Sequence, residues 1–261
     1  MINEKIVLVF PRVSKERYKH TFPPLGIMYI SSFLNKKGIK TKIIDCVADD
    51  LSILETVNLI KKESPSCLGF SMMTRQIHDA IKIAKRIKET YKEITIIGGG
   101  SHIGSTKQEL FLFTDVFDYL CYGESEEAFL EIIKNRPTSE IDGLIYKKNN
   151  KVIVNPIRNF IKDLDELPFP DLSQINLSNY HCAFTKSQRF TSMIASRGCP
   201  FSCAFCDAYA SHGRKFRKRT AKNVVDEIEL NYKKFGIKDI VFKDSTFTVD
   251  KKYTHDFCNE L

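Results

Sequence analysis

The stretch Cys199-Pro-Phe-Ser-Cys203-Ala-Phe-Cys206 follows the strand-like run Phe190–Ser196 and places three thiols in one short loop. The thiols are spaced four and then three residues apart, so they can converge on a single metal centre. Four thiolates close a tetrahedral zinc or iron–sulfur site, whereas three leave one position open. On a [4Fe–4S] cluster, this leaves one iron free to bind a small molecule.

The residues around the thiols fit a buried cluster in a tight loop. Gly198 and Pro200 suit a chain that turns sharply to aim its sulfurs inward. We expect Phe201 and Phe205 to exclude water from the cluster, because burial is one way in which a protein tunes a reduction potential.

Two simpler interpretations of the cysteine loop stay open. The loop can bind zinc, with Cys182, His181 or His212 as the fourth ligand. The three cysteines can also be ordinary buried thiols. We favour the iron–sulfur site and regard Cys182 as a bystander.

The composition places limits on the type of protein. The 261 residues are enough for one large domain or two of ordinary size, and 43% of them are hydrophobic. No stretch approaches the roughly 20 apolar residues of a membrane span. The N-terminal residues 1–10 lead almost directly into a strand and lack a secretory signal, so we expect a cytoplasmic location. In that compartment, eight cysteines indicate metal binding, redox use or burial rather than disulfides.

The net charge of +8 comes largely from lysines scattered over helix faces. One dense basic run, Arg214–Arg219, can contact a phosphate or RNA backbone, as in an RNA-modifying enzyme. We prefer the interpretation that this run covers the mouth of the cysteine-loop domain, which makes nucleic acid an unlikely partner.

Residues 1–136 alternate strands and helices, which predicts a parallel sheet with helices on both faces. The predicted strands cover residues 5–10, 41–45, 67–71, 94–97 and 119–122, and the predicted helices cover residues 25–37, 51–62, 76–91 and 126–134. This rhythm favours a flavodoxin-like (Rossmann-like) strand order of 2-1-3-4-5.

Ligands of such sheets bind outside the carboxyl ends of the strands near the point where the strand order reverses. Those ends carry Pro11-Arg12, Ser71-Met-Met-Thr74 and Gly98-Gly-Gly-Ser-His102. Gly98 and Gly99 lack a Cβ atom, so a flat or bulky group can approach the backbone there. The alternative is that these glycines only serve a tight turn.

Polar side chains at the same strand ends are further candidates for ligand contacts. Ser71 and Thr74 offer hydroxyl groups. His102 can lie at the edge of a ligand pocket or cap the next helix, and the sequence favours neither.

The rest of the chain divides into a connector and a second domain. Residues 137–189 contain a predicted β-hairpin at 141–154 with an Asn-Asn turn, followed by prolines that exclude a long regular element. Residues 190–261 read as strand, cysteine loop, helix from Thr220, strand at 238–242 and a last helix from about Asp250. This is the start of a (β/α) barrel of the TIM type, whose chemistry lies at the carboxyl ends of the strands.

Only two βα units precede Leu261, whereas a complete barrel has more. Two units alone would leave sheet edges and apolar faces uncovered. We therefore expect this chain to be a C-terminally truncated piece that is poorly active by itself.

Taken together, the motifs resemble those of a known superfamily. The spacing C-x3-C-x2-C, with Phe205 before the last cysteine, resembles the signature of the radical S-adenosylmethionine (SAM) superfamily. Pro23-Pro-Leu-Gly26 with Tyr29–Leu34 resembles the cobalamin (B12)-binding domain that precedes many radical SAM domains. So do Gly98–His102 and Gly123-Glu-Ser-Glu126.

The resemblance implies a function and its cofactors. Cys199, Cys203 and Cys206 would bind a [4Fe–4S] cluster whose open iron holds SAM. Reductive cleavage of SAM would give a 5′-deoxyadenosyl radical, with methyl transfer to an unactivated carbon as one outcome. An electron donor such as flavodoxin or ferredoxin would be needed, and the substrate is unknown. The runner-up is a truncated cobalamin- or nucleotide-binding module without catalytic activity.

The resemblance also assigns residues to the other cofactors. Ser71, Gly98 and Gly99 would help to hold the nucleotide tail of cobalamin. Asp244 and Ser245 would contact the amino end of SAM, although Thr248 or Asp250 in the same segment can instead cap the last helix.

One family feature is missing from the first domain. The cobalt-ligating motif Asp-x-His-x-x-Gly is absent, and the chain instead reads Pro11-Arg-Val-Ser-Lys-Glu-Arg-Tyr-Lys-His20. We therefore expect cobalamin to bind without a histidine ligand on cobalt.

Overall fold

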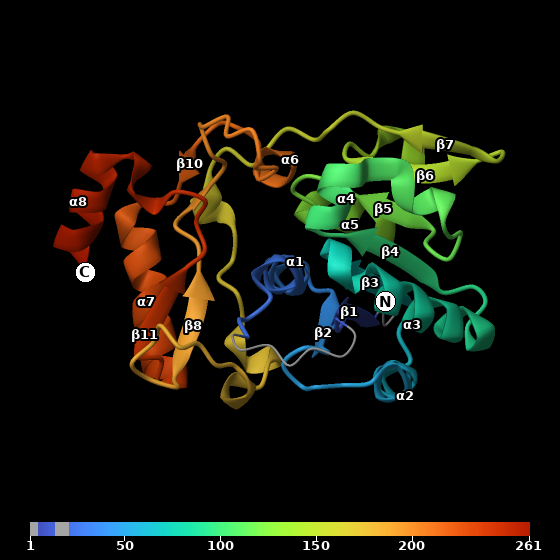
Figure 1. Cartoon of the computed structure of the whole chain (residues 1–261), viewed down its shortest axis with the longest axis horizontal. Coiled ribbons are helices and arrows are strands. Elements are labelled where there is room, and N and C mark those ends of the chain that lie inside the picture. Colours follow the sequence, from blue (N-terminus) through green and yellow to red (C-terminus); the bar gives the residue numbers. More distant parts are fainter. Residues whose placement is uncertain (1–4, 14–20) are drawn as a thin grey trace.

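A computed structural model describes residues 5–13 and 21–261 of the chain (Figure 1). In the described part, seven strands form one sheet in the order β2-β1-β3-β4-β5-β6-β7. The first five strands are parallel to one another. Their order confirms the predicted flavodoxin-like arrangement. The strands are β1 (Lys5–Phe10), β2 (Lys40–Asp45), β3 (Cys67–Ser71), β4 (Thr95–Gly99), β5 (Tyr119–Cys121), β6 (Leu144–Lys148) and β7 (Lys151–Val154).

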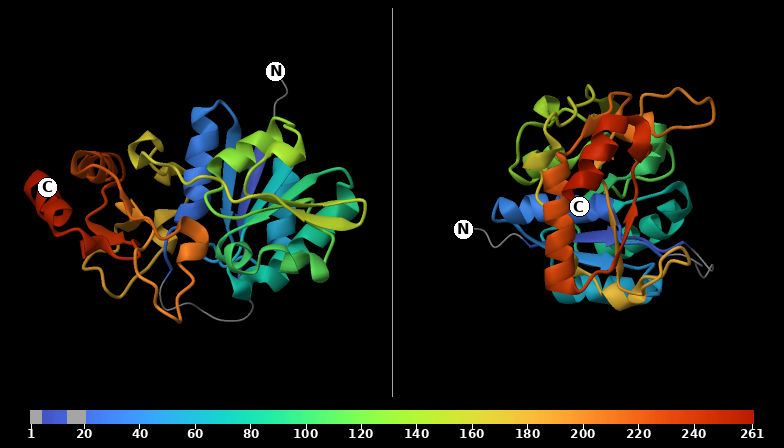
Figure 2. Two further views of the ribbon diagram at one scale, coloured as in Figure 1. Left: turned by 90° about the horizontal axis from the view of Figure 1, so that it is seen from above. Right: turned by 90° about the vertical axis from the view of Figure 1, so that its left-hand side faces the viewer.

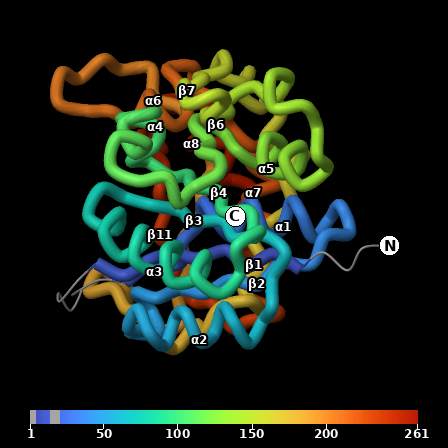
Figure 3. The backbone as a smooth tube through the Cα atoms, turned by 90° about the vertical axis from the view of Figure 1, so that its right-hand side faces the viewer, coloured from blue at the N-terminus to red at the C-terminus, as the bar shows by residue number. Residues whose placement is uncertain are grey.

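Helices cover both faces of this sheet, as the alternating pattern predicts. They are α1 (Leu25–Lys36), α2 (Ile53–Glu63), α3 (Ile77–Thr90), α4 (Ser101–Thr106) and α5 (Glu126–Ile133). Figure 3 shows α2 and α3 on the side of the sheet opposite to α1 and α5. The short helix α4 was not predicted, because its sequence Ser-His-Ile-Gly-Ser-Thr has no helical apolar stripe.

The buried strand β1 shows how the sequence builds two cores. Successive side chains of a strand point to opposite faces of the sheet. Ile6 and Leu8 therefore join one apolar cluster with α1 and α5, whereas Val7 and Val9 join the other with α2 and α3. Each fully buried aliphatic side chain stabilises the fold by about 1.5–3 kcal/mol.

The predicted β-hairpin is present, and it pairs with the edge of the first sheet. β6 pairs with β5, and β7 pairs with β6, both antiparallel. Asn149 and Asn150 make the turn with φ angles of 51° and 59°, as a tight hairpin turn requires. The predicted domain boundaries at residues 136 and 189 stay predictions.

The C-terminal part forms the predicted strand–helix–strand–helix unit. Strands β8 (Phe190–Met193) and β11 (Asp239–Phe242) pair in parallel, and helices α7 (Ala221–Phe235) and α8 (Lys251–Glu260) pack on them. Thr220 caps α7, and Asp250 caps α8 by accepting a hydrogen bond from Tyr253 N. The predicted capping role of Asp250 is thereby confirmed.

Two short strands and one short helix in this part were not predicted. Strands β9 (Ser196–Arg197) and β10 (Arg217–Lys218) pair antiparallel, and helix α6 (Tyr209–His212) lies between them in sequence. Figures 1 and 2 show the C-terminal unit beside the first sheet, with α1 between them. Tyr29 of α1 accordingly packs on Leu164, Leu167 and Ile194.

Across the described ranges, no helix is both long enough and apolar enough to pass through a bilayer.

Candidate functional site

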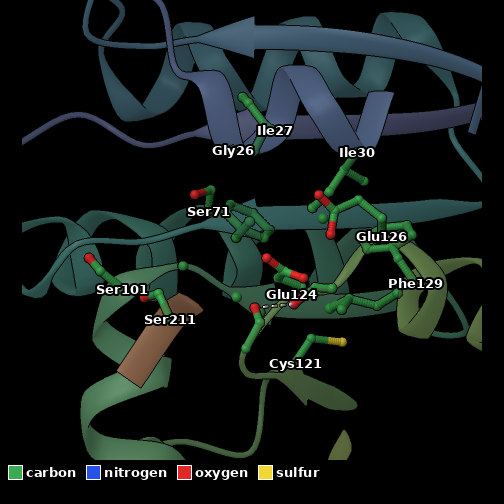
Figure 4. Close-up of a pocket in the computed structure, with 18 of the residues that line it drawn as sticks. Gly26, Ile27, Ile30, Ser71, Ser101, Cys121, Glu124, Glu126, Phe129 and Ser211 are labelled. Atoms are coloured by element: carbon green, nitrogen blue, oxygen red, sulfur yellow. Dashed lines mark hydrogen bonds between the residues drawn. The ribbon is translucent and has the colours of Figure 1, made fainter. Parts of the chain in front are cut away.

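A cavity of about 250 Å³ lies between the first sheet and the C-terminal unit (Figure 4). Its floor is formed by the ends of β3, β4 and β5, and its sides by α1, α5 and the β9–α6 region. Residues that line it include Gly26, Ile27, Ser71, Gly99, Cys121 and Phe129. The cavity therefore lies where the sheet order predicts a ligand site.

The two predicted glycines of the site have different roles. Both Gly98 and Gly99 line the cavity. A Cβ atom at Gly99 would lie 3.6 Å from Cys121 O, which is an ordinary contact, so this glycine leaves space for a ligand. A Cβ at Gly98 would lie only 2.8 Å from Leu120 Cδ2, so a side chain there would have to displace Leu120 in the core instead of leaving space for a ligand.

Gly100, which the prediction did not single out, shapes the turn after β4. Its φ angle of +99° favours glycine, and a Cβ atom there would lie 2.5 Å from Met72 N. The tight approach holds the β4 end against the β3 end, where Met72 N donates a hydrogen bond to Gly99 O at 2.8 Å.

The predicted polar residues divide into one that lines the cavity and two that do not. Ser71 lines the cavity. Thr74 and His102 instead contact each other, with 3.1 Å between Thr74 Oγ1 and His102 Nδ1. Burial lowers the pKa of His102. Helix α4 has no side-chain cap, so the alternative that His102 caps this helix is wrong.

A buried group of charges forms the wall of the cavity towards the C-terminal unit. Glu124, from the turn after β5, faces Arg197 of β9 and Arg217 of β10, and Glu126, the first residue of α5, faces Arg197. Burial alone would raise the pKa of the Glu124 carboxyl, but His212, Arg217 and Arg197 face the carboxylate and lower the pKa to about 2. Glu124 is therefore ionised at neutral pH, and the group balances two carboxylates against two guanidinium groups.

Sequence reasoning did not assign these four charges to a site. Gly123–Glu126 entered only through the family resemblance, Arg217 only within the basic run Arg214–Arg219, and Arg197 was not singled out. Arg197 follows a buried strand end, and a charged residue there needs a buried partner. The position of Arg197 directly after a buried strand was therefore the sequence feature that could have indicated a buried ion pair.

The cysteine loop follows the predicted strand region, which in the structure is divided into β8 and the short strand β9. Cys199 is half-buried, whereas Cys203 and Cys206 are exposed. No three His, Cys, Asp or Glu side chains within the described ranges are grouped so that they could hold a metal ion. Thiols do not attract one another, and metal sites commonly assemble together with the metal that they bind.

The donor set of the loop nevertheless fits an iron–sulfur cluster. It offers three free thiols in one accessible segment, and Cys199 Sγ lies 3.8 Å from Thr246 Oγ1 in the loop after β11. Phe205 is 94% exposed and Phe201 is also exposed, so the expectation that they shield the thiols from water is not met. Each ring is part of a loop that has no core of its own to bury it.

The candidate fourth ligands for zinc have other surroundings. Cys182 packs in an apolar cluster with Tyr180 and Phe190, in agreement with a bystander role. His212 Nδ1 lies 3.4 Å from Glu124 Oε1. His181 pairs through its backbone with Thr21.

The cysteine loop also packs against the first domain through α4 and α6. Ser105 of α4 donates a hydrogen bond to Asp207, the residue after Cys206. Gly104 allows a close approach, because a Cβ atom there would lie 3.3 Å from Ser211 Oγ. The helix that follows the glycine-rich end of β4 therefore contacts the loop that carries the thiols.

The loop after β11 lies at the same end of the unit as the cysteine loop. The Asp244 carboxylate accepts hydrogen bonds from Ala195 N at 3.1 Å and from Ser196 Oγ. Burial raises the pKa of Asp244. Ser245 is exposed. Asp244 thus ties two strand ends together, and its role towards SAM stays a prediction.

The basic run is used mainly for internal contacts. Arg217 and Arg219 are buried, and Arg219 pairs with Glu227. Lys218 pairs with Asp250, and Arg214 donates to Phe201 O at 2.7 Å. Because these charges are paired inside the chain, the run gives little support to RNA binding. His20 of the loop after β1 lies outside the described residues.

The fold and the site together define a class. A flavodoxin-like domain with a glycine-lined cavity is joined to βα units that carry a three-cysteine loop. Residues 11–133 match the family model described as "B12 binding domain". This match and the three-cysteine loop support the resemblance to the radical SAM proteins that carry an N-terminal B12-binding domain.

Related sequences agree with this assignment. The chain is 33% identical over 255 residues to an uncharacterized methyltransferase of Pyrococcus horikoshii, covering 95% of this chain and 55% of that protein. It is 27% identical over 249 residues to an anaerobic magnesium-protoporphyrin IX monomethyl ester cyclase of Rubrivivax gelatinosus, covering 92% and 44%. The chain thus spans about half the length of the curated relatives it matches.

Solved structures share the fold. The radical enzyme OxsB, solved with aqua-cobalamin and SAM bound, superposes with a TM-score of 0.82 at 21% identity. The match covers 98% of this chain and 37% of OxsB. The methyltransferase TsrM from Kitasatospora setae gives a TM-score of 0.74 at 18% identity, covering 98% and 50%.

Proposed function

We propose that this chain is the cobalamin- and cluster-binding part of a radical SAM enzyme, with methyl transfer as its reaction. The observation that carries the proposal is the contact between the domain that contains the cavity and the segment that carries the cysteine loop, made by Ser105 with Asp207 and by Glu124 with Arg197. Relatives named as a methyltransferase and a cyclase favour an enzyme over a module that only binds a ligand.

The residues present would hold the cofactors in two neighbouring places. Cys199, Cys203 and Cys206 would bind a [4Fe–4S] cluster. Ser71 and Gly99 would hold the nucleotide tail of cobalamin in the cavity. When bound, the cluster supplies the electron that cleaves SAM to a 5′-deoxyadenosyl radical, and cobalamin carries the methyl group.

The other predicted contacts lie around these two places. Asp244 keeps the β8 and β11 ends together, so that Ser245 can approach the amino end of SAM. Thr74 and His102, which lie outside the cavity lining, would contact a part of the ligand that extends beyond the cavity, and they would orient each other. The exposed ring of Phe205 would pack on a group that binds next to the thiols.

The wider setting follows from this chemistry. The electron would come from a donor such as flavodoxin or ferredoxin, and the protein would work in the cytoplasm, where thiols stay reduced. We propose a division into a cobalamin-binding domain (1–136), a connector (137–189) and the beginning of the radical SAM barrel (190–261).

Two measurements test the proposal. Titration with hydroxocobalamin should shift its visible absorption bands, and the pigment should elute with the protein in gel filtration. Anaerobic reconstitution with iron and sulfide should give brown protein. Protein that takes up neither pigment nor iron would refute the proposal.

A further inference from the structure

The loop that carries the three thiols lies between two short paired strands, β9 and β10. These strands are the stems of the loop, and each contributes a buried arginine next to it. The loop spans residues 198–216, between Arg197 of β9 and Arg217 of β10. These two arginines are direct partners in the antiparallel pairing of β9 and β10. Whatever holds both arginines therefore holds both ends of the loop.

The carboxylate of Glu124, in the turn after β5 of the first sheet, binds the arginines of both stems. Glu124 Oε1 lies 3.2 Å from a terminal nitrogen of Arg197 and 2.9 Å from one of Arg217. Glu124 Oε2 accepts a second bond from Arg217 at 3.0 Å and one from Ile161 N at 2.8 Å. Glu126 adds a contact of 2.7 Å to Arg197.

This ionic group is almost completely removed from water. The side chains of Glu124, Arg197 and Arg217 are 1%, 4% and 5% exposed. The guanidinium groups also lie over aromatic rings, Arg197 over Tyr29 at 5.1 Å and Arg217 over Phe160 at 5.0 Å. Hydrogen bonds to carboxylates and stacking on rings fix the orientation of the guanidinium groups. Apolar side chains of similar size would also be buried, but they would not fix the orientation of the loop ends.

The same group faces the cavity. Glu124, Glu126, Arg197 and His212 all line it. Arg217 further donates to His212 O at 2.9 Å, and Cys199 N donates to Gly213 O at 3.2 Å, so the inner part of the loop is tied to the same point.

We propose that Glu124 is a positioning residue that fixes the cysteine loop, through Arg197 and Arg217, against the wall of the cavity. The carboxylate thereby sets how the thiols of the loop stand relative to a ligand in the cavity. The identity of the two ligands rests on the proposed function, but the fixation of the loop does not.

The chain provides a matched control for this role. Glu227 of α7 forms an equally buried ion pair with Arg219, with side chains 2% and 4% exposed and 2.5 Å between Oε2 and the guanidinium nitrogen. That pair joins α7 to the segment after β10 and is not among the residues that line the cavity. Loss of its charge should affect stability without freeing the cysteine loop.

The test compares Glu124→Gln and Glu227→Gln in the full chain by hydrogen–deuterium exchange. We expect backbone exchange in residues 198–216 to become at least tenfold faster in Glu124→Gln, and to stay within twofold of the wild type in Glu227→Gln. If Glu124→Gln does not fold, Arg217→Lys tests the same contact, because lysine keeps the charge but cannot make both bonds. Equal loop exchange in the variant and its control would overturn the inference.

A second measurement links the loop to its ligands. After anaerobic reconstitution, we expect SAM to change the electron paramagnetic resonance signal of the reduced wild type and of Glu227→Gln, and to have a weaker effect on Glu124→Gln. An unaltered response in Glu124→Gln would count against the positioning role. Wild-type protein that takes up no iron would refute the proposed function alone, since the exchange experiment needs no ligand.

Discussion

The cavity and the cysteine loop differ in how much of each is built by the chain itself. The cavity has a floor of strand ends, glycines that pack at contact distance and a wall of buried ion pairs. In the cysteine loop, Cys203, Cys206 and Phe205 are exposed, and the thiols are not grouped around a common point. The cavity is therefore preorganised. The cysteine loop is fixed at its two ends, whereas the segment that carries Cys203 and Cys206 is exposed.

The difference follows from what stabilises each half. Apolar burial and backbone hydrogen bonds shape the cavity without any ligand. Bringing three thiols of a loop together gives no favourable free energy until they bind a common metal centre, because metal binding and local folding are coupled. Substitutions in the two regions should therefore have different consequences.

The largest expected effect is the loss of the cluster when a loop cysteine is replaced. Cys199→Ala, Cys203→Ala or Cys206→Ala should each remove most of the iron that reconstitution adds, because a cluster with two protein ligands is not retained. Iron content per chain and the brown absorption measure the effect. Hydroxocobalamin should still bind, because the cavity is formed by other elements.

Cys258→Ala is the matched control for these variants. Cys258 is also an exposed free cysteine, but it lies on α8 outside the loop. Its replacement should leave the iron content unchanged. If all four variants lose iron equally, the cluster is not specific to the loop.

The next effect concerns the stability of the cavity. Gly100→Ala should lower the free energy of unfolding by roughly 3 kcal/mol, because alanine is strained at positive φ and its Cβ would overlap Met72. Gly26→Ala, in α1 beside the same cavity, meets no atom within 4 Å and should stabilise the protein by up to about 1 kcal/mol. Urea unfolding measures both, and equal values would show that the β4 turn is not tightly packed.

A smaller effect is expected at the loop after β11. Asp244→Ala should cost about 1–3 kcal/mol, because Ala195 N and Ser196 Oγ lose their acceptor in a buried place. Ser245→Ala should change stability by less than about 0.5 kcal/mol, since Ser245 is exposed. A weaker affinity for SAM in Ser245→Ala at unchanged stability would separate ligand contact from structural support.

The smallest effect depends on pH. Burial raises the pKa of Asp45 to about 6 from 3.8, despite hydrogen bonds from Ala48, Tyr180 and Val47. A raised pKa in the folded state means that this group contributes stability below pH 4 that is lost as the pH rises through 6. Asp45→Asn should therefore gain roughly 1 kcal/mol relative to the wild type between pH 5 and pH 8. The melting temperatures of both proteins, measured across this pH range, check the prediction. If the two melting temperatures change with pH in the same way, the raised pKa of Asp45 is contradicted.

Much of the fold could be predicted from periodicity and turn residues. Continuous apolar runs such as Lys5–Phe10 identify buried parallel strands, and the stripe of helix α3 gives its orientation. The strand order follows from the alternation of elements. The hairpin, predicted at 141–154, was found from its Asn-Asn turn. Its pairing with the predicted strand β5 was not, because local sequence does not specify which edge a hairpin joins.

The site was only partly predictable for a similar reason. Cys199, Cys203 and Cys206 are neighbours in sequence, so their spacing alone is informative. Glu124 and Arg217 are 93 positions apart, and their pairing appears only when β5 and β10 are brought together. Gly98 was grouped with Gly99 because the two are adjacent at the end of β4, although successive residues of a strand point to opposite faces.

The most direct test of the account is the metal content of the full chain after anaerobic reconstitution with iron and sulfide in the presence of competing zinc. We predict about four iron atoms per chain and an absorption typical of a [4Fe–4S] cluster. Both should disappear when the three loop cysteines are replaced together. One zinc ion per chain, without iron absorption, would contradict the account.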